Sequence, residues 1–174
     1  GGDEYALILR NVNVGDIESI ADGFRQTLTA TPFVHAGKSY RITLSIGVSW
    51  NKIYAKLGSD YKKPDVTTLI TPDNYRAIVW PLPAGDLLFV GPRTVPKLRK
   101  LGINTIGDLA CADDRTMQSW FGKVGLMHGT NARGEDCSPV MTSGFEMAIK
   151  SIGNSTTTPQ DMITNEDVKS VYTL

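Results

Sequence analysis

The sequence holds few of the residues that build metal sites and covalent catalytic centres. Its two cysteines, Cys111 and Cys137, are 26 positions apart and form no C-x-x-C pair, so a zinc site is not expected. Its two histidines, His35 and His128, adjoin no candidate nucleophile. These absences argue against a Ser-His-Asp or Cys-His mechanism. With so few cysteines, a reducing, cytoplasmic location is expected.

Long apolar runs are equally absent. No stretch approaches the ~18–20 consecutive apolar residues of a membrane helix, and no basic segment leads into an apolar one near the start. We therefore expect no membrane partner. Hydrophobic residues make up 41% of the chain and charged residues 21%, the balance of a folded globular protein. The chain opens at Gly1 and stops at Leu174 within a periodic segment, which suggests a fragment.

Charge of neither sign prevails, but the charges are unevenly distributed. The 18 Lys and Arg side chains balance the 18 Asp and Glu side chains. Residues 49–110 nonetheless hold nine basic against five acidic side chains, whereas residues 1–48 hold four against five and residues 111–174 hold five against eight. A basic middle third is expected of a phosphate-binding surface. On charge alone, an ordinary solvated surface is the simpler interpretation.

Periodicity predicts an alternating α/β order in the first half. The predicted strands are residues 5–10, 41–49 and 66–70. One helix is predicted from Asp16, as its N-cap, to Ala30, and a second over residues 51–59 after a Ser49 cap. Thr71-Pro72 predicts the start of a third helix, because Pro is favoured at the first helical position.

The second half shows no strand pattern until its end. Trp80-Pro81-Leu82-Pro83 predicts a linker, and short helical segments between glycines predict a helical domain over residues 84–134. Phe145, Met147 and Ile149 alternate as in a strand, which indicates that a third unit starts near residue 144.

The first residues form a motif suited to nucleotide chemistry. In Gly1-Gly2-Asp3-Glu4-Tyr5, the glycines allow close approach of a ligand and the adjacent carboxylates suit Mg²⁺, although a polar hairpin turn favours the same residues. With the following helix and strand, residues 1–49 resemble the second half of a GGDEF-type diguanylate cyclase domain. That family makes cyclic dimeric GMP from GTP. The resemblance implies that Asp3 and Glu4 face the metal and that Gly1 and Gly2 lie near the nucleotide. The usual ending of that family is missing after residue 49.

A second set of motifs runs through the rest of the chain. The blocks are SIGVSWNK (45–52), AKLGSD (55–60), KP (63–64), WPLP (80–83), FVG (89–91), LGINTIGDL (101–109) and KSIGNS (150–155). In this order, residues 44–174 resemble the Y-family (translesion, UmuC-like) DNA polymerases. The resemblance implies a palm, a thumb and the start of a little-finger domain.

The polymerase resemblance assigns roles to basic residues near the second predicted helix. It implies that Lys63, with Lys62 beside it, contacts the triphosphate of the incoming nucleotide. Lys52 and Lys56 are four positions apart, a mildly unfavourable pair of like charges unless an anion meets them. A triphosphate or a DNA backbone would be such an anion, and a solvated helix face is the alternative.

A second basic segment follows the predicted linker. Residues 87–101 predict a helix, a hairpin at Gly91 and a second helix, which looks like the helix-hairpin-helix element of the polymerase thumb. Backbone N–H groups near Gly91 and Thr94, with the side chains of Arg93 and Lys97, would then hold a DNA phosphate without reading sequence. A plain helical hairpin with basic solvation is the alternative.

The sequence therefore predicts a partial α/β palm with a ferredoxin-type sheet (1–79), a small all-α helix-hairpin-helix thumb (84–134) and the start of an α/β little-finger domain (144–174). The predicted function is damage-tolerant DNA synthesis in DNA repair by two-metal nucleotidyl transfer. Asp3 and Glu4 are the predicted Mg²⁺ ligands, and primer-template DNA and deoxynucleoside triphosphates the predicted partners. A sliding-clamp partner is not visible. The alternatives are a diguanylate cyclase that uses GTP and a non-catalytic DNA-binding module.

Two further expectations concern the chain by itself. A two-metal site needs another carboxylate, which both families carry on an earlier strand, so this chain alone is expected to be inactive. Without that strand the palm sheet has an open edge, so weak stability or self-association is expected.

Overall fold

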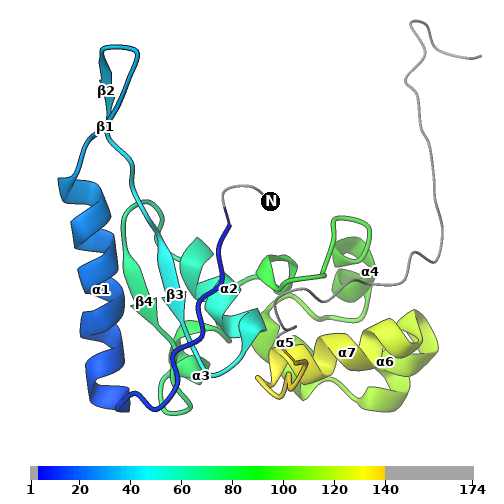
Figure 1. Cartoon of the computed structure of the whole chain (residues 1–174). Coiled ribbons are helices and arrows are strands. Elements are labelled where there is room, and N and C mark those ends of the chain that lie inside the picture. The colour runs from blue at the N-terminus through cyan, green and yellow to red at the C-terminus, as the bar shows by residue number, and fades with distance from the viewer. Residues whose placement is uncertain (1–3, 140–174) are drawn as a thin grey trace, which may run out of the picture. The chain divides into compact units, whose positions relative to one another are not determined.

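The computed structural model describes residues 4–139, nearly all within one compact unit, Gly1–Ser138. A mixed α/β region comes first and a helical region follows (Figure 1). The elements are α1 (Val14–Ala30), β1 (Phe33–His35), β2 (Lys38–Tyr40), β3 (Ile46–Val48), α2 (Lys52–Asp60), β4 (Thr67–Leu69), α3 (Tyr75–Ile78), the 3₁₀ turn η1 (Ala84–Asp86), α4 (Val95–Lys100), α5 (Ile106–Cys111), α6 (Asp114–Phe121) and α7 (Lys123–Ala132). Residues 1–3 and the predicted little-finger start (144–174) lie outside the described residues.

A parallel pair of strands lies at the centre of the α/β region. β3 pairs with β4, Ile46 opposite Thr67 and Val48 opposite Leu69. α2 makes the connection between them, because parallel strands need a crossover rather than a tight turn. The pair lies between α1 and α2 (Figure 1). The strands predicted at residues 41–49 and 66–70 are thus present, each over three residues.

Gly47 allows α2 to pack closely on β3. A Cβ atom at this position would lie 1.8 Å from the backbone oxygen of Ala55 and 2.3 Å from the backbone nitrogen of Ser59. No side chain fits at such distances, so the glycine of the SIGVS block is required by helix–strand packing. In return, α2 buries Ile53 and Leu57 against the strands.

α1 covers the opposite face of the strand pair. The helix was expected at this place, but its N-cap is Asn13 rather than Asp16, because the Asn13 side chain accepts a hydrogen bond from the backbone nitrogen of Gly15. Ala21 is buried, whereas Phe24 on the same helix is half exposed.

The prediction of a strand at residues 5–10 is wrong. The segment has no strand structure, and Tyr5 is 89% exposed. A strand forms only when it hydrogen-bonds to a neighbouring strand. Within residues 4–139, β3 pairs with β4 and not with residues 5–10. The described chain therefore holds two two-stranded sheets and not a ferredoxin-type sheet. The second sheet is the hairpin β1–β2 around Ala36-Gly37, where the sequence predicted only the turn.

The helical region surrounds a continuous apolar core, and the described part of residues 84–134 forms helices as predicted. Its most buried side chains are Leu87, Leu98, Ile106, Leu109 and Met117. The predicted linker at residues 80–83 is packed against this core. Pro83 forms a β-bridge with Thr105, and the backbone oxygen of Trp80 accepts a hydrogen bond from Gly107.

The helix predicted between Leu87 and the hairpin at Gly91 is absent: the short turn η1 ends at Asp86, and residues 87–90 are not helical. The chain then bends at Phe89, whose φ of 72° lies in the left-handed region, and α4 begins at Val95. The C-cap residue of η1, Leu87, takes an extended backbone conformation (φ −70°, ψ 132°), so the turn does not continue into a longer helix. Of the predicted pair of helices, the structure thus has the second, α4, with six residues, and not the first.

The start of α2 joins the two regions. The N-cap of α2 is Asn51, not the predicted Ser49, because its side chain accepts from the backbone nitrogen of Tyr54. Asn51 Nδ2 and Trp50 Nε1 both donate to the backbone oxygen of Gly134, at 3.0 and 3.1 Å. The buried hydroxyl of Tyr54 donates to the oxygen of Ala132 at 2.8 Å. We call these contacts the α2–α7 junction.

Candidate functional site

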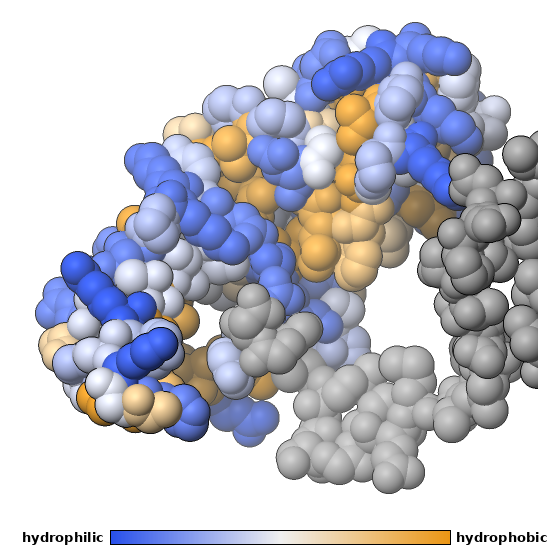
Figure 2. Space-filling view, turned by 90° about the horizontal axis from the view of Figure 1, so that it is seen from above, coloured by the Kyte–Doolittle hydropathy of each residue, from blue (hydrophilic) through white to orange (hydrophobic). Residues whose placement is uncertain are grey.

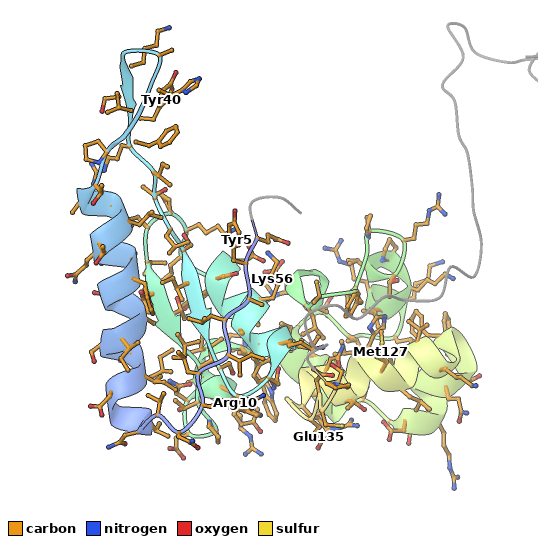
Figure 3. All side chains as sticks on the ribbon, viewed as in Figure 1. Tyr5, Arg10, Tyr40, Lys56, Met127 and Glu135 are labelled. Atoms are coloured by element: carbon orange, nitrogen blue, oxygen red, sulfur yellow. The ribbon has the colours of Figure 1, made fainter. Side chains whose placement is uncertain are left out.

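Three of the predicted functional residues meet beside α2. Lys56 Nζ lies 2.8 Å from Glu4 Oε1 and 2.7 Å from Asp60 Oδ2, and Lys63 Nζ lies 2.6 Å from Asp60 Oδ1. Figure 3 shows Lys56 close to the N-terminal segment that carries Tyr5. We call Glu4, Lys56, Asp60 and Lys63 the lysine–carboxylate cluster. It brings a predicted metal ligand and two predicted phosphate-binding lysines to one place.

The cluster is charged and open to solvent. Hydrogen bonds to Asp60 and Glu4 raise the pKa of Lys56. Partial burial opposes ionisation of Asp60, but hydrogen bonds from Lys56 and Lys63 hold its pKa below the usual value. The Asp60 and Lys63 side chains are 45% and 53% exposed. Ion pairs this exposed contribute only about 0–1 kcal/mol each, so a stronger anion can replace them.

The anion that Lys56 contacts belongs to this chain. The spacing of Lys52 and Lys56 suggested a bound phosphate, but Lys56 pairs with Asp60 one turn later. Sequence reasoning missed Asp60, although a carboxylate four positions after one lysine and three before another was a readable signal.

Lys52 and Lys62 lie beside the cluster. Lys52 is exposed on the first turn of α2, and Lys62 Nζ lies 5.0 Å from the centre of the Tyr61 ring. Lys62 takes a left-handed backbone conformation with φ of 56°.

The second predicted group lies at the turn before α4. Arg93 and Lys97 are exposed. The backbone nitrogens of Thr94 and Val95 donate to the oxygen of Gly91, at 2.9 and 3.3 Å. These N–H groups are used within the turn, so a phosphate contact here depends on the basic side chains. Two further basic residues, Arg99 and Lys100, lie in the last turn of α4.

A network that the sequence did not predict joins α1 to the segment before β4. Arg25 Nε donates to Asp22 at 2.7 Å and Arg25 Nη1 to Asp65 at 3.0 Å, while Thr67 donates to Asp22 at 3.0 Å. Hydrogen bonds from Arg25 lower the pKa of both carboxyls. The network borders a surface hollow of about 520 Å³. Arg25 and Asp65 are 40 positions apart, so no local pattern could pair them.

The described residues do not by themselves fit a Mg²⁺ ion. Within residues 4–139, no group of three or more His, Cys, Asp or Glu side chains is placed to hold a metal. Glu4 contacts Lys56, and Asp3, Gly1 and Gly2 lie outside the described residues.

Among the helices of the described chain, none combines the length and apolar character required to cross a membrane.

Comparison with known proteins shows one consistent relationship. DNA polymerase IV of Acetivibrio thermocellus is 42% identical over 155 residues, which cover 89% of this chain and 37% of that protein. DNA polymerase IV 1 of Bacillus subtilis is 37% identical over 135 residues, 78% of this chain and 32% of that protein. The chain thus spans about a third of the length of these relatives.

Solved structures agree on the fold. The crystal structure of DinB from Sulfolobus solfataricus matches with a TM-score of 0.59 and 23% identity, over 74% of this chain and 36% of that one. The mixed α/β architecture is therefore similar to the palm-like region of Y-family polymerases.

The cyclase resemblance finds no support in the comparisons. No family model matches the chain. The alignment with the Acetivibrio polymerase leaves 19 of the 174 residues outside (174 less 155). At least 30 of the first 49 residues therefore align with a polymerase.

Proposed function

Because the chain is homologous to the DNA polymerase IV proteins of the Y family, we propose that it is part of a template-directed DNA polymerase of the damage-tolerant kind. The observation that carries this proposal is the 42% identity across 89% of the chain. The activity, the substrates and the partners belong to the proposal, since the chain spans about a third of its relatives.

In this proposal residues 1–79 act as part of the palm, residues 84–134 as the thumb and residues 144–174 as the start of the little finger. The α2–α7 junction supports a fixed arrangement of the first two, because three side chains at the start of α2 donate to backbone oxygens at the end of α7 and just after it. A fixed arrangement would let nucleotide contacts on one part and DNA contacts on the other act together.

The lysine–carboxylate cluster is the proposed end of the nucleotide site. Lys63 and Lys62 would contact the triphosphate of a deoxynucleotide, with Gly1 and Gly2 near it. The support is that Lys63 is exposed and that, within residues 4–139, it forms an exchangeable ion pair with Asp60.

The proposed DNA contacts are made chiefly by charge. Arg93 and Lys97, with Gly91 and Thr94 in the same turn, would hold a backbone phosphate, and Lys52 and Lys56 would add positive charge along α2. Contacts of this kind supply affinity without base specificity, and their number sets the salt dependence of binding.

Asp3 and Glu4 are the proposed metal-facing pair, and Mg²⁺ would supply charge neutralisation for nucleotidyl transfer. In the described residues Glu4 is paired with Lys56, so metal binding would require Lys56 to release it. A further carboxylate is needed, and we expect this chain alone to bind substrates without extending a primer.

The test is primer-template DNA binding across a salt series. Arg93→Ala/Lys97→Ala should weaken binding and lower the magnitude of the log–log salt slope by about one unit per lost phosphate contact. Asp3→Ala/Glu4→Ala should leave that slope unchanged. A matched control is Arg115→Ala/Lys123→Ala, which removes the same two charges from exposed positions on α6 and α7.

Two results would contradict the proposal. Equal weakening by the control pair would show general electrostatic attraction rather than a site at the turn before α4. Absence of DNA binding, together with Mg²⁺-dependent GTP binding that requires Asp3 and Glu4, would favour the cyclase instead.

A further inference from the structure

Asp60 connects two basic side chains through a single carboxylate. Lys63 Nζ contacts one carboxylate oxygen at 2.6 Å and Lys56 Nζ contacts the other at 2.7 Å. Lys56 belongs to α2 and Lys63 to the loop that follows, so the carboxylate brings together cations from two segments. The two ammonium groups therefore contact the same carboxylate, each through one of its two oxygens.

The position of Asp60 in α2 does not by itself favour an aspartate. Asp60 is the last residue of the helix, where the partial negative charge of the helix end disfavours a carboxylate. Its i,i+4 ion pair with Lys56 offsets part of this cost. Its contacts with Lys56 and Lys63 are therefore the feature that needs an explanation.

These ion pairs can be exchanged. The Asp60, Lys63 and Lys56 side chains are all accessible to solvent, and exposed pairs are individually weak. A polyphosphate chain presents several charged oxygens and more than one negative charge, so it can contact both ammonium groups at once. The Asp60 carboxylate competes with such a polyphosphate for the same two ammonium groups.

We propose that Asp60 is the resident counter-ion of a polyphosphate site, holding Lys56 and Lys63 together until phosphate oxygens displace it. The inference rests on the proposed function, which places Lys63 at the triphosphate. The shared ligand chemistry is a row of phosphate groups, from either a nucleoside triphosphate or a DNA backbone. Asp60 therefore lowers the affinity of the site, because its two ion pairs must break on binding.

The experiment is calorimetric titration of the full chain with inorganic tripolyphosphate at low salt without divalent metal. Asp60→Asn should bind about three- to tenfold more tightly, because neither lysine is then held by a carboxylate at position 60. Asp73→Asn is the matched control. It removes the same charge from an exposed position beyond β4 and should change affinity by less than about twofold.

A second arm separates the two phosphate sources. The same variants are titrated with a short DNA duplex. If the Asp60 variants bind tripolyphosphate more tightly, the site is assigned to a free polyphosphate chain. If they bind only the DNA duplex more tightly, it is assigned to the DNA backbone. Asp60→Ser, which is also neutral, should show the same increase in affinity. A structural disturbance specific to one substitution therefore cannot decide the result.

The outcomes also separate this inference from the proposed function. If Lys63→Gln weakens tripolyphosphate binding but folded Asp60→Asn and Asp60→Ser bind no more tightly than wild type, the Asp60 inference fails and the nucleotide contact stands. If Lys63→Gln has no effect either, both fail. If Asp73→Asn increases the affinity as much as Asp60→Asn does, the inference is also overturned, because the change in net charge alone would explain the result.

Discussion

His128 is a histidine that the fold keeps away from water. It is fully buried in α7, and neither ring nitrogen has a hydrogen-bond partner among residues 4–139. Burial lowers its pKa, because the charged imidazolium would lose its hydration without gaining a partner. The histidine that looked catalytically idle in the sequence is therefore an acid-sensitive point in the core.

Acidification should weaken the fold through His128. The unfolded chain takes up the proton near pH ~6.5, whereas the folded chain resists it until a lower pH. The stabilisation present above pH ~6.5 is therefore lost as pH falls toward the folded pKa, by at most about 1.4 kcal/mol per pH unit. Denaturant unfolding at about pH 7.5 and 5.5 measures this, because one value lies above the unfolded pKa and the other below it. His128→Leu should flatten the dependence and His35→Gln, at an exposed site, should not. Equal wild-type stability at the two pH values would refute it.

Gly134 is required by the α2–α7 junction. Its φ is 77°, and a Cβ atom would lie 2.8 Å from Tyr54 Cε2 and 2.9 Å from Trp50 Cζ2. Gly134→Ala should cost about 1–3 kcal/mol of unfolding free energy through overpacking and backbone strain. The matched control is Gly23→Ala in α1, where nothing lies within 4 Å, and it should stabilise by about 0.5–1 kcal/mol. Denaturation curves measure both, and a neutral Gly134→Ala would contradict the close packing.

At the scale of elements, α5 depends on its first turn. The Thr105 side chain accepts from the backbone nitrogen of Asp108 at 3.0 Å, and Asp108 Oδ2 accepts from those of Thr105 and Asn104 at 2.9 and 3.0 Å. Hydrogen bonds from these backbone groups hold the pKa of Asp108 below its usual value. This reciprocal capping fixes where α5 starts and orients Ile106 and Leu109 into the core.

Asp108→Ala should lower the unfolding free energy by about 1 kcal/mol, because two backbone N–H groups lose their acceptor. Asp86→Ala in η1, another exposed aspartate of the helical region, is the control and should cost less. Thermal melts of both variants provide the comparison. If Asp86→Ala proves as costly as Asp108→Ala, general charge effects rather than the cap would account for the loss.

At the scale of the whole molecule, apolar surface is left open in the α/β region. In Figure 2 the broadest apolar area of the face in view lies toward the helical region, and the side of α1 and the hairpin shows smaller apolar patches among hydrophilic side chains. Tyr5, Leu7 and Phe24 are among the exposed large hydrophobic residues, as is Phe33 on the hairpin. Apolar surface of this kind favours association between copies of the chain.

We expect the chain to self-associate as its concentration rises. Phe24→Gln on α1 should shift the equilibrium toward monomer in sedimentation velocity, because it removes exposed apolar area from the α/β region. The control is Phe89→Gln, which removes an equally apolar exposed side chain from the helical region. A wild-type chain that stays monomeric across the concentration range would contradict the expectation.

The sequence by itself determined the elements whose residues interact locally. Apolar spacing placed α1 and α2, the SIGVS block placed β3, and glycine-separated segments indicated a helical region over residues 84–134. The ordered motif blocks also indicate the relationship to the Y-family polymerases that the comparisons show. These predictions succeeded because helix periodicity, strand alternation and short motifs depend on neighbours within a few positions.

The tertiary structure decided what depends on distant residues. Residues 5–10 have a strand-like sequence but no strand structure, because strand formation depends on a partner. The oxygen of Gly134, 83 positions after Asn51, holds the N-cap of α2, and Arg25 meets Asp65 across 40 positions. Asp60 was readable from its spacing, yet only the folded chain shows that its carboxylate joins Lys56 to Lys63 while Glu4 reaches the same ammonium. Hydrogen bonds and ion pairs of this kind depend on side-chain positions that packing sets and local sequence does not.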